Sequence, residues 1–130
     1  MATYLLDTTV IIDVLNNKRN RRGLLRDLLE SNHLLACCSV SVTEIYAGMR
    51  PKEERATDEF LSSLEYLAVS FPIARLAGEL QREHARKGKT LNLGDVTIAA
   101  VAIYEQLTLL TDNVKDFPMR ELSLYPMPKA

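Results

Sequence analysis

The stretch YLLDTTVII, residues 4–12, decides the fold, because an apolar run breaks at a carboxylate and then resumes with a different spacing. The residues before Asp7 are apolar and strand-like, whereas the apolar residues from Val10 to Leu15 recur at helical spacing. The pattern predicts a strand that passes directly into a helix, with Asp7 at the junction. Such a junction is a common place for a helix cap or for an active-site acid.

Strand-like runs and helical patterns alternate along the rest of the chain. The predicted strands are 4–6, 34–40, 68–71 and 107–110, with a weaker fifth at 122–125. The clearest helix starts at Pro72 and stops at Gly88; others cover about 53–66 and, apolar on nearly every face, 96–103. This alternation predicts an α/β fold whose mostly parallel sheet is covered by helices on both faces.

Length and charge narrow the possibilities further. A chain of 130 residues is long enough for one well-buried domain and too short for two ordinary ones, so we expect a single domain spanning 1–130. Sixteen basic and seventeen acidic side chains give a net charge of -1, so nucleic-acid binding would require a local basic patch.

The cysteines and the hydropathy of the sequence indicate the cellular compartment of the protein. Cys37 and Cys38 are adjacent in an apolar run, and we expect them to be buried and reduced. The N-terminus lacks a signal-peptide pattern, and no apolar run reaches the roughly 18 residues of a membrane span. The sequence therefore predicts a cytoplasmic protein.

Carboxylates recur just past the predicted strands or in the first turn of the following helix. Asp7 follows the first strand, Glu44 lies in SVSVTEIYAG, and Asp95 opens the buried helix. Asp112 or Asp116 in LLTDNVKDF follows the fourth strand. Each acid alone also has a structural explanation, because an acid near a helix N-terminus complements the dipole and three stretches resemble capping boxes: 41–44, 92–95 and 113–116.

Taken together, these acids favour a shared site, since the carboxyl ends of parallel strands meet at the edge where such folds bind ligands. Two like charges about 4 Å apart repel by roughly 4 kcal/mol at an effective dielectric near 20, so such a cluster requires shifted pKa values or a cation. Oxygen ligands suit Mg²⁺ or Mn²⁺ rather than zinc. Such an ion can activate water and offset charge on a scissile phosphate, which predicts a metal-dependent nuclease.

Four segments occur in order over almost the whole chain: LLDTTVIID, SVTEIYAG, LGDVTIAAVA and LLTDNVKDF. In this order they resemble the successive motifs of the PIN-domain family, especially the VapC-type toxins of bacterial toxin-antitoxin pairs. The resemblance implies cleavage of single-stranded RNA with Mg²⁺ or Mn²⁺, with Asp7, Glu44 and Asp95 as the first three acids. Thr9 and Thr111 match the family's hydroxyl positions.

The resemblance also implies an architecture and partners. It predicts a three-layer α/β/α fold with a sheet of four to five strands, a homodimer, and a small VapB-type antitoxin whose C-terminal segment occupies the groove. The fourth acid stays open between two residues. In the family, the last motif is approximately Thr, any residue, Asn or Asp, and then a few residues to Asp-Phe. Asn113 fills the Asn or Asp position of this motif, which favours Asp116 as the fourth acid and leaves Asp112 as the alternative.

Basic residues gather in two places. They would either contact RNA phosphates or form a solvated helix face, and the sequence supports these two interpretations equally. The two groups are Lys18, Arg19, Arg21, Arg22 and Arg26, and Arg82, Arg86, Lys87 and Lys89. We expect His84 to pack on its helix and His33 to lie at a turn, and neither is needed if water is the nucleophile. Tyr46 is expected to pack rather than stack on a base, and Asp13 lies outside the site.

Two other functions compete with the nuclease. An acid after the first strand is also the phosphoryl acceptor of receiver and phosphatase-like domains. The phosphatase pattern requires a second Asp where this chain has Thr9, and the paired acids and late Lys of a receiver cannot be placed. The second alternative is a non-catalytic relative that binds protein or RNA. Metal titration distinguishes it, because a catalytic site should bind Mn²⁺ through Asp7 and Asp95.

Overall fold

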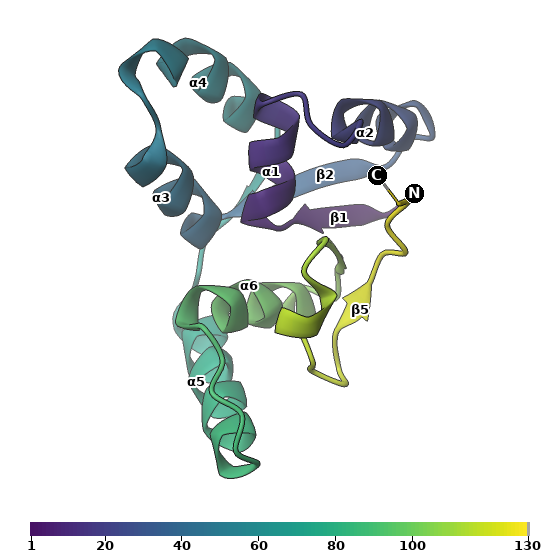
Figure 1. Ribbon diagram of the computed structural model, residues 1–130. Coiled ribbons are helices and arrows are strands. Elements are labelled where there is room, and N and C mark those ends of the chain that lie inside the picture. Colours follow the sequence, from purple (N-terminus) through teal and green to yellow (C-terminus); the bar gives the residue numbers. More distant parts are fainter. Residues whose placement is uncertain (130) are drawn as a thin grey trace.

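The computed structural model describes residues 1–129 and is built on a central β-sheet (Figure 1). The strand order is β3-β2-β1-β4-β5, and every neighbouring pair is parallel. The strands are β1 (Thr3–Leu6), β2 (Leu34–Cys38), β3 (Glu65–Leu67), β4 (Thr108–Leu110) and β5 (Ser123–Leu124). The expected α/β class with a central parallel sheet is therefore confirmed.

Helices cover both faces of the sheet, because successive strand residues point to opposite sides. Leu5 packs in one core with α5 and α6, and Leu6 packs in the other with α1 to α4, which gives three layers (Figure 1). The helices are α1 (Thr8–Leu15), α2 (Arg21–Glu30), α3 (Ser39–Gly48), α4 (Glu54–Ser62), α5 (Phe71–Arg86) and α6 (Leu93–Tyr104), with 3₁₀ turns η1 (Pro51–Glu53) and η2 (Val114–Asp116).

The adjacent cysteines follow the same alternation. Cys37 belongs to the core under α1 to α4, and Cys38 belongs to the core under α5 and α6. Both are buried free thiols, as expected, and burial raises the pKa of Cys37 to about 11, so this thiol stays protonated at neutral pH. None of the helices in residues 1–129 has both the length and the hydropathy needed to span a lipid bilayer.

Several predicted bounds are wrong, most clearly those of the second strand, the third strand and the helix between them. The second strand ends at Cys38 rather than at residue 40, because α3 begins at Ser39. The third strand is Glu65–Leu67 rather than 68–71, and the helix expected to reach residue 66 ends at Ser62. The physical reason is the start of α5: the Ser70 hydroxyl accepts a hydrogen bond from the Ile73 amide and caps a helix that begins at Phe71.

The sheet register explains how the site is assembled. Leu6 pairs with Leu110, so the residues that follow them, Asp7 and Thr111, emerge side by side. The Asp7 amide donates to the Leu110 carbonyl at 2.9 Å, which continues the ladder one residue past β1. β2 lies on the other side of β1 and passes directly into α3. Three segments far apart in sequence thus reach one edge of the sheet.

Candidate active site

Asp7 lies at the junction of β1 and α1, as the sequence predicts, and caps α1 with its own side chain. The residue is only 2% exposed. Its Oδ1 accepts from the Thr8 amide at 2.8 Å, while Oδ2 accepts from the hydroxyls of Thr9 at 3.0 Å and Thr111 at 2.7 Å. These three donors fix the carboxylate in one orientation.

The electrostatics of Asp7 are set by opposing effects. Burial raises the pKa of Asp7, and the hydrogen bonds from Thr111, Thr9 and Thr8 only partly offset that rise. The charge of Glu44 raises the pKa further. One carboxylate therefore caps α1 and also interacts electrostatically with a second acid.

Glu44 lies on α3 and is held by a residue of α1. The Thr8 hydroxyl donates to Glu44 Oε1 at 2.7 Å and lies 2.9 Å from the hydroxyl of Ser41. Since Thr8 gives its only hydrogen to the carboxylate, Ser41 must donate to Thr8. No pattern in the sequence predicts these two hydroxyl contacts. The capping box expected over residues 41–44 does not start the helix, because α3 begins two residues before Ser41 and its N-cap is Cys38.

Asp95 lies in the first turn of α6, where Asn92 caps the helix by accepting from the Asp95 amide at 3.1 Å. The pKa of Asp95 is raised to about 6, mainly by burial and then by the negative charges of Asp7, Asp116 and Glu44. All four expected acids therefore interact electrostatically at one edge of the sheet. This edge lies at the carboxyl ends of β1, β2 and β4.

The two candidates for the fourth acid have different surroundings. Asp116 ends η2, where its charge raises the pKa of Asp95. Asp112 forms an ion pair with Arg21, whose Nη2 lies 2.7 Å from Oδ1, and Arg19 Nη1 lies 3.7 Å from Oδ2. The capping box expected over residues 113–116 is not formed, because Asn113 makes no side-chain cap. These surroundings favour Asp116 as the fourth acid of the cluster.

The donor set fits a hard divalent cation. Within residues 1–129, no three His, Cys, Asp or Glu side chains form a ready group that could hold a metal ion. Mg²⁺ does not require such a cage, because it keeps several waters and binds through one or two carboxylates together with substrate phosphates. Four coupled carboxylates, one of which is rigidly oriented by three donors, match that chemistry.

In the first basic cluster Arg21 is buried, whereas the other four residues are exposed. Arg21 is buried against Asp112, so it is neither a phosphate ligand nor part of a solvated face. Arg22 donates to the carbonyls of Val14 at 2.7 Å and Leu15 at 3.1 Å and thereby satisfies the end of α1. In the second cluster the side chains are exposed, and Lys87 pairs with Glu83 at 3.6 Å.

The remaining polar residues lie outside the acid cluster. His84 Nδ1 lies 2.9 Å from the Leu80 carbonyl on its own helix. His33 accepts from the Ala2 amide at 3.0 Å and packs edge-on against Tyr4. The Tyr46 ring is partly exposed, and its hydroxyl donates to Asp58. The hydrogen bonds of all three side chains therefore lead to partners other than the four acids.

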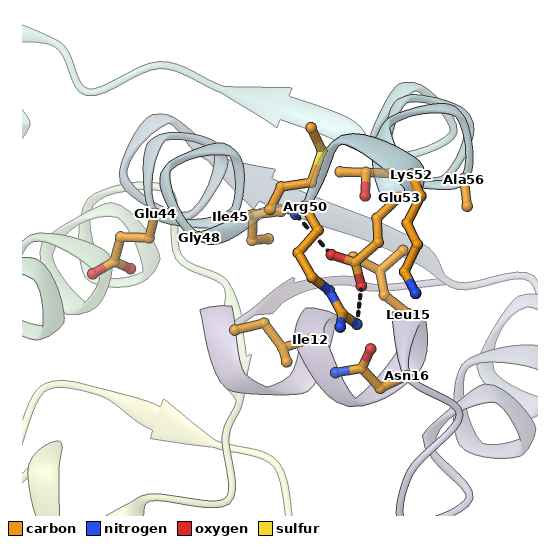
Figure 2. Close-up of a pocket in the computed structure, with 12 residues that line it drawn as sticks. Ile12, Leu15, Asn16, Glu44, Ile45, Gly48, Arg50, Lys52, Glu53 and Ala56 are labelled. Atoms are coloured by element: carbon orange, nitrogen blue, oxygen red, sulfur yellow. Dashed lines mark hydrogen bonds and ion pairs between the residues drawn. The ribbon is translucent and has the colours of Figure 1, made fainter.

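A groove of about 480 Å³ begins beside the acid cluster (Figure 2). Glu44 lies at one end, and Ile12 and Ile45 contribute apolar walls from α1 and α3. Arg50 lies further along, where its Nη2 pairs with Glu53 Oε2 at 3.2 Å. The groove therefore combines apolar walls with charged groups and opens onto one of the four acids.

Comparison with known proteins agrees with this architecture. The PIN domain family matches residues 4–118. Ribonuclease VapC19 of Mycobacterium tuberculosis is 34% identical over 88% of this chain and 92% of that protein, and Ribonuclease VapC2 of Rickettsia felis is 33% identical over 88% and 89%. The crystal structure of VapBC2 from Rickettsia felis bound to a promoter DNA fragment superposes with a TM-score of 0.83 at 31% identity, covering 95% of this chain and 97% of that one. The chain therefore belongs to the PIN-domain family and is of the VapC type.

Proposed function

We propose that this chain is a metal-dependent endoribonuclease, the toxin of a type II toxin-antitoxin pair, which cleaves RNA phosphodiester bonds with water as the nucleophile. The observation that carries the proposal is the convergence of Asp7, Glu44, Asp95 and Asp116, which raises the pKa of Asp95 to about 6. Carboxylates coupled in this way favour a divalent cation, and a divalent cation beside an open groove suits phosphodiester hydrolysis.

Ribonucleases of this family generally depend on a divalent metal ion. We propose Mg²⁺, with Mn²⁺ as a substitute, bound through Asp7 and Asp95, with Glu44 and Asp116 as further ligands or as acceptors for the waters around the ion. The bound ion would activate the attacking water and offset charge on the scissile phosphate. The protein's own contribution is orientation: Thr9 and Thr111 hold Asp7.

Asp7 is poorly suited to the competing role of a phosphoryl acceptor. The residue is 2% exposed, and both of its carboxylate oxygens accept hydrogen bonds. A phosphoryl acceptor must admit a whole tetrahedral phosphoryl group beside its oxygen, whereas a metal ligand needs only one free lone pair, which Oδ1 retains. The structure therefore favours water as the nucleophile.

We further propose that a VapB-type antitoxin occupies the groove of Figure 2 and that the toxin is a homodimer. The related structures from Rickettsia felis and Salmonella typhimurium are described as VapBC complexes bound to DNA. Occupation of the groove would cover Glu44 and block access to the acids. Cleavage by the purified toxin should stop on addition of the cognate antitoxin and resume when the antitoxin is removed.

The test of the proposed function is cleavage of a mixed pool of structured and single-stranded RNAs by antitoxin-free protein, with Mg²⁺ or with EDTA. Wild type is compared with Asp95→Asn and with Asp27→Asn, a matched control that removes one exposed charge from α2. We expect metal-dependent cutting by wild type and the control only. Folded wild type that neither cuts RNA nor binds Mn²⁺ would instead indicate a non-catalytic binding module.

A further inference from the structure

Arg21 is buried at a place where local rules disfavour an arginine. It is the first residue of α2 and is only 2% exposed. A helix start carries partial positive charge, so a cation there is unfavourable, and burial of a guanidinium costs desolvation energy. The two preceding residues, Arg19 and Asn20, adopt left-handed backbone conformations with φ of 54° and 55°. Violations of local rules are expected mainly where function requires them.

The guanidinium of Arg21 joins three segments that are distant in sequence. Nη2 and Nε donate to the two carboxylate oxygens of Asp112, at 2.7 and 3.3 Å. Nη1 donates to the Arg19 carbonyl and Nη2 also donates to the Pro128 carbonyl, both at 3.3 Å. The start of α2, the loop after β4 and the C-terminal region are thus tied together by one side chain.

The loop that Arg21 holds carries two members of the active site. Thr111 precedes Asp112 directly; its hydroxyl donates to Asp7 and accepts from the Asn113 amide at 3.0 Å. Three residues beyond Asn113, the same loop ends η2 at Asp116, whose amide donates to the Asn113 carbonyl at 2.9 Å. An anchor on Asp112 therefore constrains both a hydroxyl that orients Asp7 and the fourth acid.

We propose that Arg21 is a positioning residue of the active site: its forked ion pair with Asp112 holds the loop 111–116 so that Thr111 faces Asp7 and Asp116 faces Asp95. The proposal rests on the proposed function, because these are the acids assigned to the metal. Arg21 also neutralises Asp112, which would otherwise add a fifth negative charge beside the cluster. Residues that orient metal ligands in this way typically change metal affinity or activity about 10- to 100-fold when replaced.

A first test needs neither metal nor RNA. Hydrogen exchange of the Asn113 amide reports the bond to Thr111, and it is measured in wild type, Arg21→Met and Arg22→Met. Arg22 is the matched control, because its guanidinium also donates to backbone carbonyls but binds the end of α1 instead of the loop. We expect exchange at Asn113 to accelerate about tenfold or more in Arg21→Met and to stay unchanged in Arg22→Met.

A second test measures Mn²⁺ affinity by calorimetry and kcat for a single-stranded RNA, both per folded molecule. We expect Arg21→Met and Asp112→Asn each to weaken Mn²⁺ binding and to lower kcat about 10-fold or more. Because both replacements break the same ion pair, the Mn²⁺ affinity and kcat of the double variant should be no lower than those of the more impaired single variant. If Arg21→Met fails to fold, Arg21→Lys keeps the charge but loses the fork and should show the same loss.

Unchanged Mn²⁺ affinity and kcat in folded Arg21 variants, or equal losses in Arg22→Met, would overturn the positioning role and leave a purely structural ion pair. The two proposals can fail separately. A wild type that neither binds Mn²⁺ nor cleaves RNA would overturn the proposed function, whereas accelerated exchange at Asn113 only in Arg21→Met would still support the role of Arg21 in holding the loop.

Discussion

The Thr8 hydroxyl donates a 2.7 Å hydrogen bond to Oε1 of Glu44, so the first helix fixes an acid that belongs to the third. Behind Thr8, the hydroxyl of Ser41 is fully buried and lies 2.9 Å away. A carboxylate on a helix surface normally samples several rotamers, and ordering it costs conformational entropy. The hydrogen bonds of Ser41 and Thr8 order the Glu44 carboxylate when the protein folds, so that it is already oriented in the folded state.

Replacing Thr8 with Val should test this relationship, because Val keeps the shape and removes the hydroxyl. It leaves Ser41 without its partner, which should destabilise the fold by about 1–2 kcal/mol. The free Glu44 carboxylate should lower Mn²⁺ affinity and kcat about 10-fold. Thermal unfolding measures the stability, calorimetry measures the Mn²⁺ affinity, and cleavage kinetics measure kcat.

The matched control for Thr8→Val is Thr108→Val. Thr108 and Ser123 form a similar hydroxyl pair at 3.2 Å, but it links β4 to β5 at the other end of the sheet. This variant should cost some stability and leave kcat unchanged. Equal losses of kcat in both variants would show that Thr8 acts only on stability.

Gly94 lies at a close approach between α6 and α3. A Cβ added there would lie 3.1 Å from Glu44 Oε2 and 3.0 Å from Asn92 Oδ1, so both side chains would have to shift by a few tenths of an ångström. Gly94→Ala should therefore lower kcat about 10-fold through displacement of Glu44. Its stability should change by less than about 1 kcal/mol, because the helix propensity of Ala offsets the strain.

Gly78 is the matched control for Gly94, because it lies inside α5 and an added Cβ meets nothing within 4 Å. Gly78→Ala should raise the free energy of unfolding by about 0.5–1 kcal/mol and leave kcat unchanged. Full activity of Gly94→Ala would show that the position of Glu44 tolerates this displacement.

The sequence predicts the parts of the site that depend on local pattern. The position of Asp7 between an apolar strand and an amphipathic helix follows from the switch between two periodicities, and the Asn92 cap of α6 follows from residue type at a helix start. The convergence of the acids follows from parallel topology, because Leu6 and Leu110 end in register.

The features that the sequence does not reveal depend on tertiary contacts. β3 is a three-residue edge strand with two exposed residues, so it lacks the apolar signature of a central strand. Arg21 resembles its basic neighbours in sequence, and only the fold brings Asp112, 91 residues away, to its guanidinium. The role of Thr8 likewise depends on the approach of α1 to α3, which no local pattern encodes.

The raised pKa of Asp95 predicts a pH dependence of stability in metal-free protein. Between its ordinary value of 3.8 and about 6, the folded protein binds more protons than the unfolded chain, so stability falls as the pH rises through this window. Because Asp95 is only partly buried, the loss should amount to about 1 kcal/mol. Urea unfolding at pH 4 to 7 should show the decline in wild type and a weaker one in Asp95→Asn. Equal profiles would show that Asp95 titrates normally.

A divalent ion should reverse this trend, because it binds the ionised carboxylates and competes with protons for them. At a Mn²⁺ concentration 100 times the Kd, the folded state should gain about 2.7 kcal/mol. The increase in melting temperature should be large at pH 7.5 and small at pH 5, because the pKa of Asp95 is raised to about 6 and keeps a proton on the site at the lower pH. Asp7→Asn should abolish the increase at both pH values, since it removes the charge of a proposed ligand at nearly constant size. Mn²⁺ stabilisation that is equal at both pH values, or that survives in Asp7→Asn, would place the ion away from the four acids.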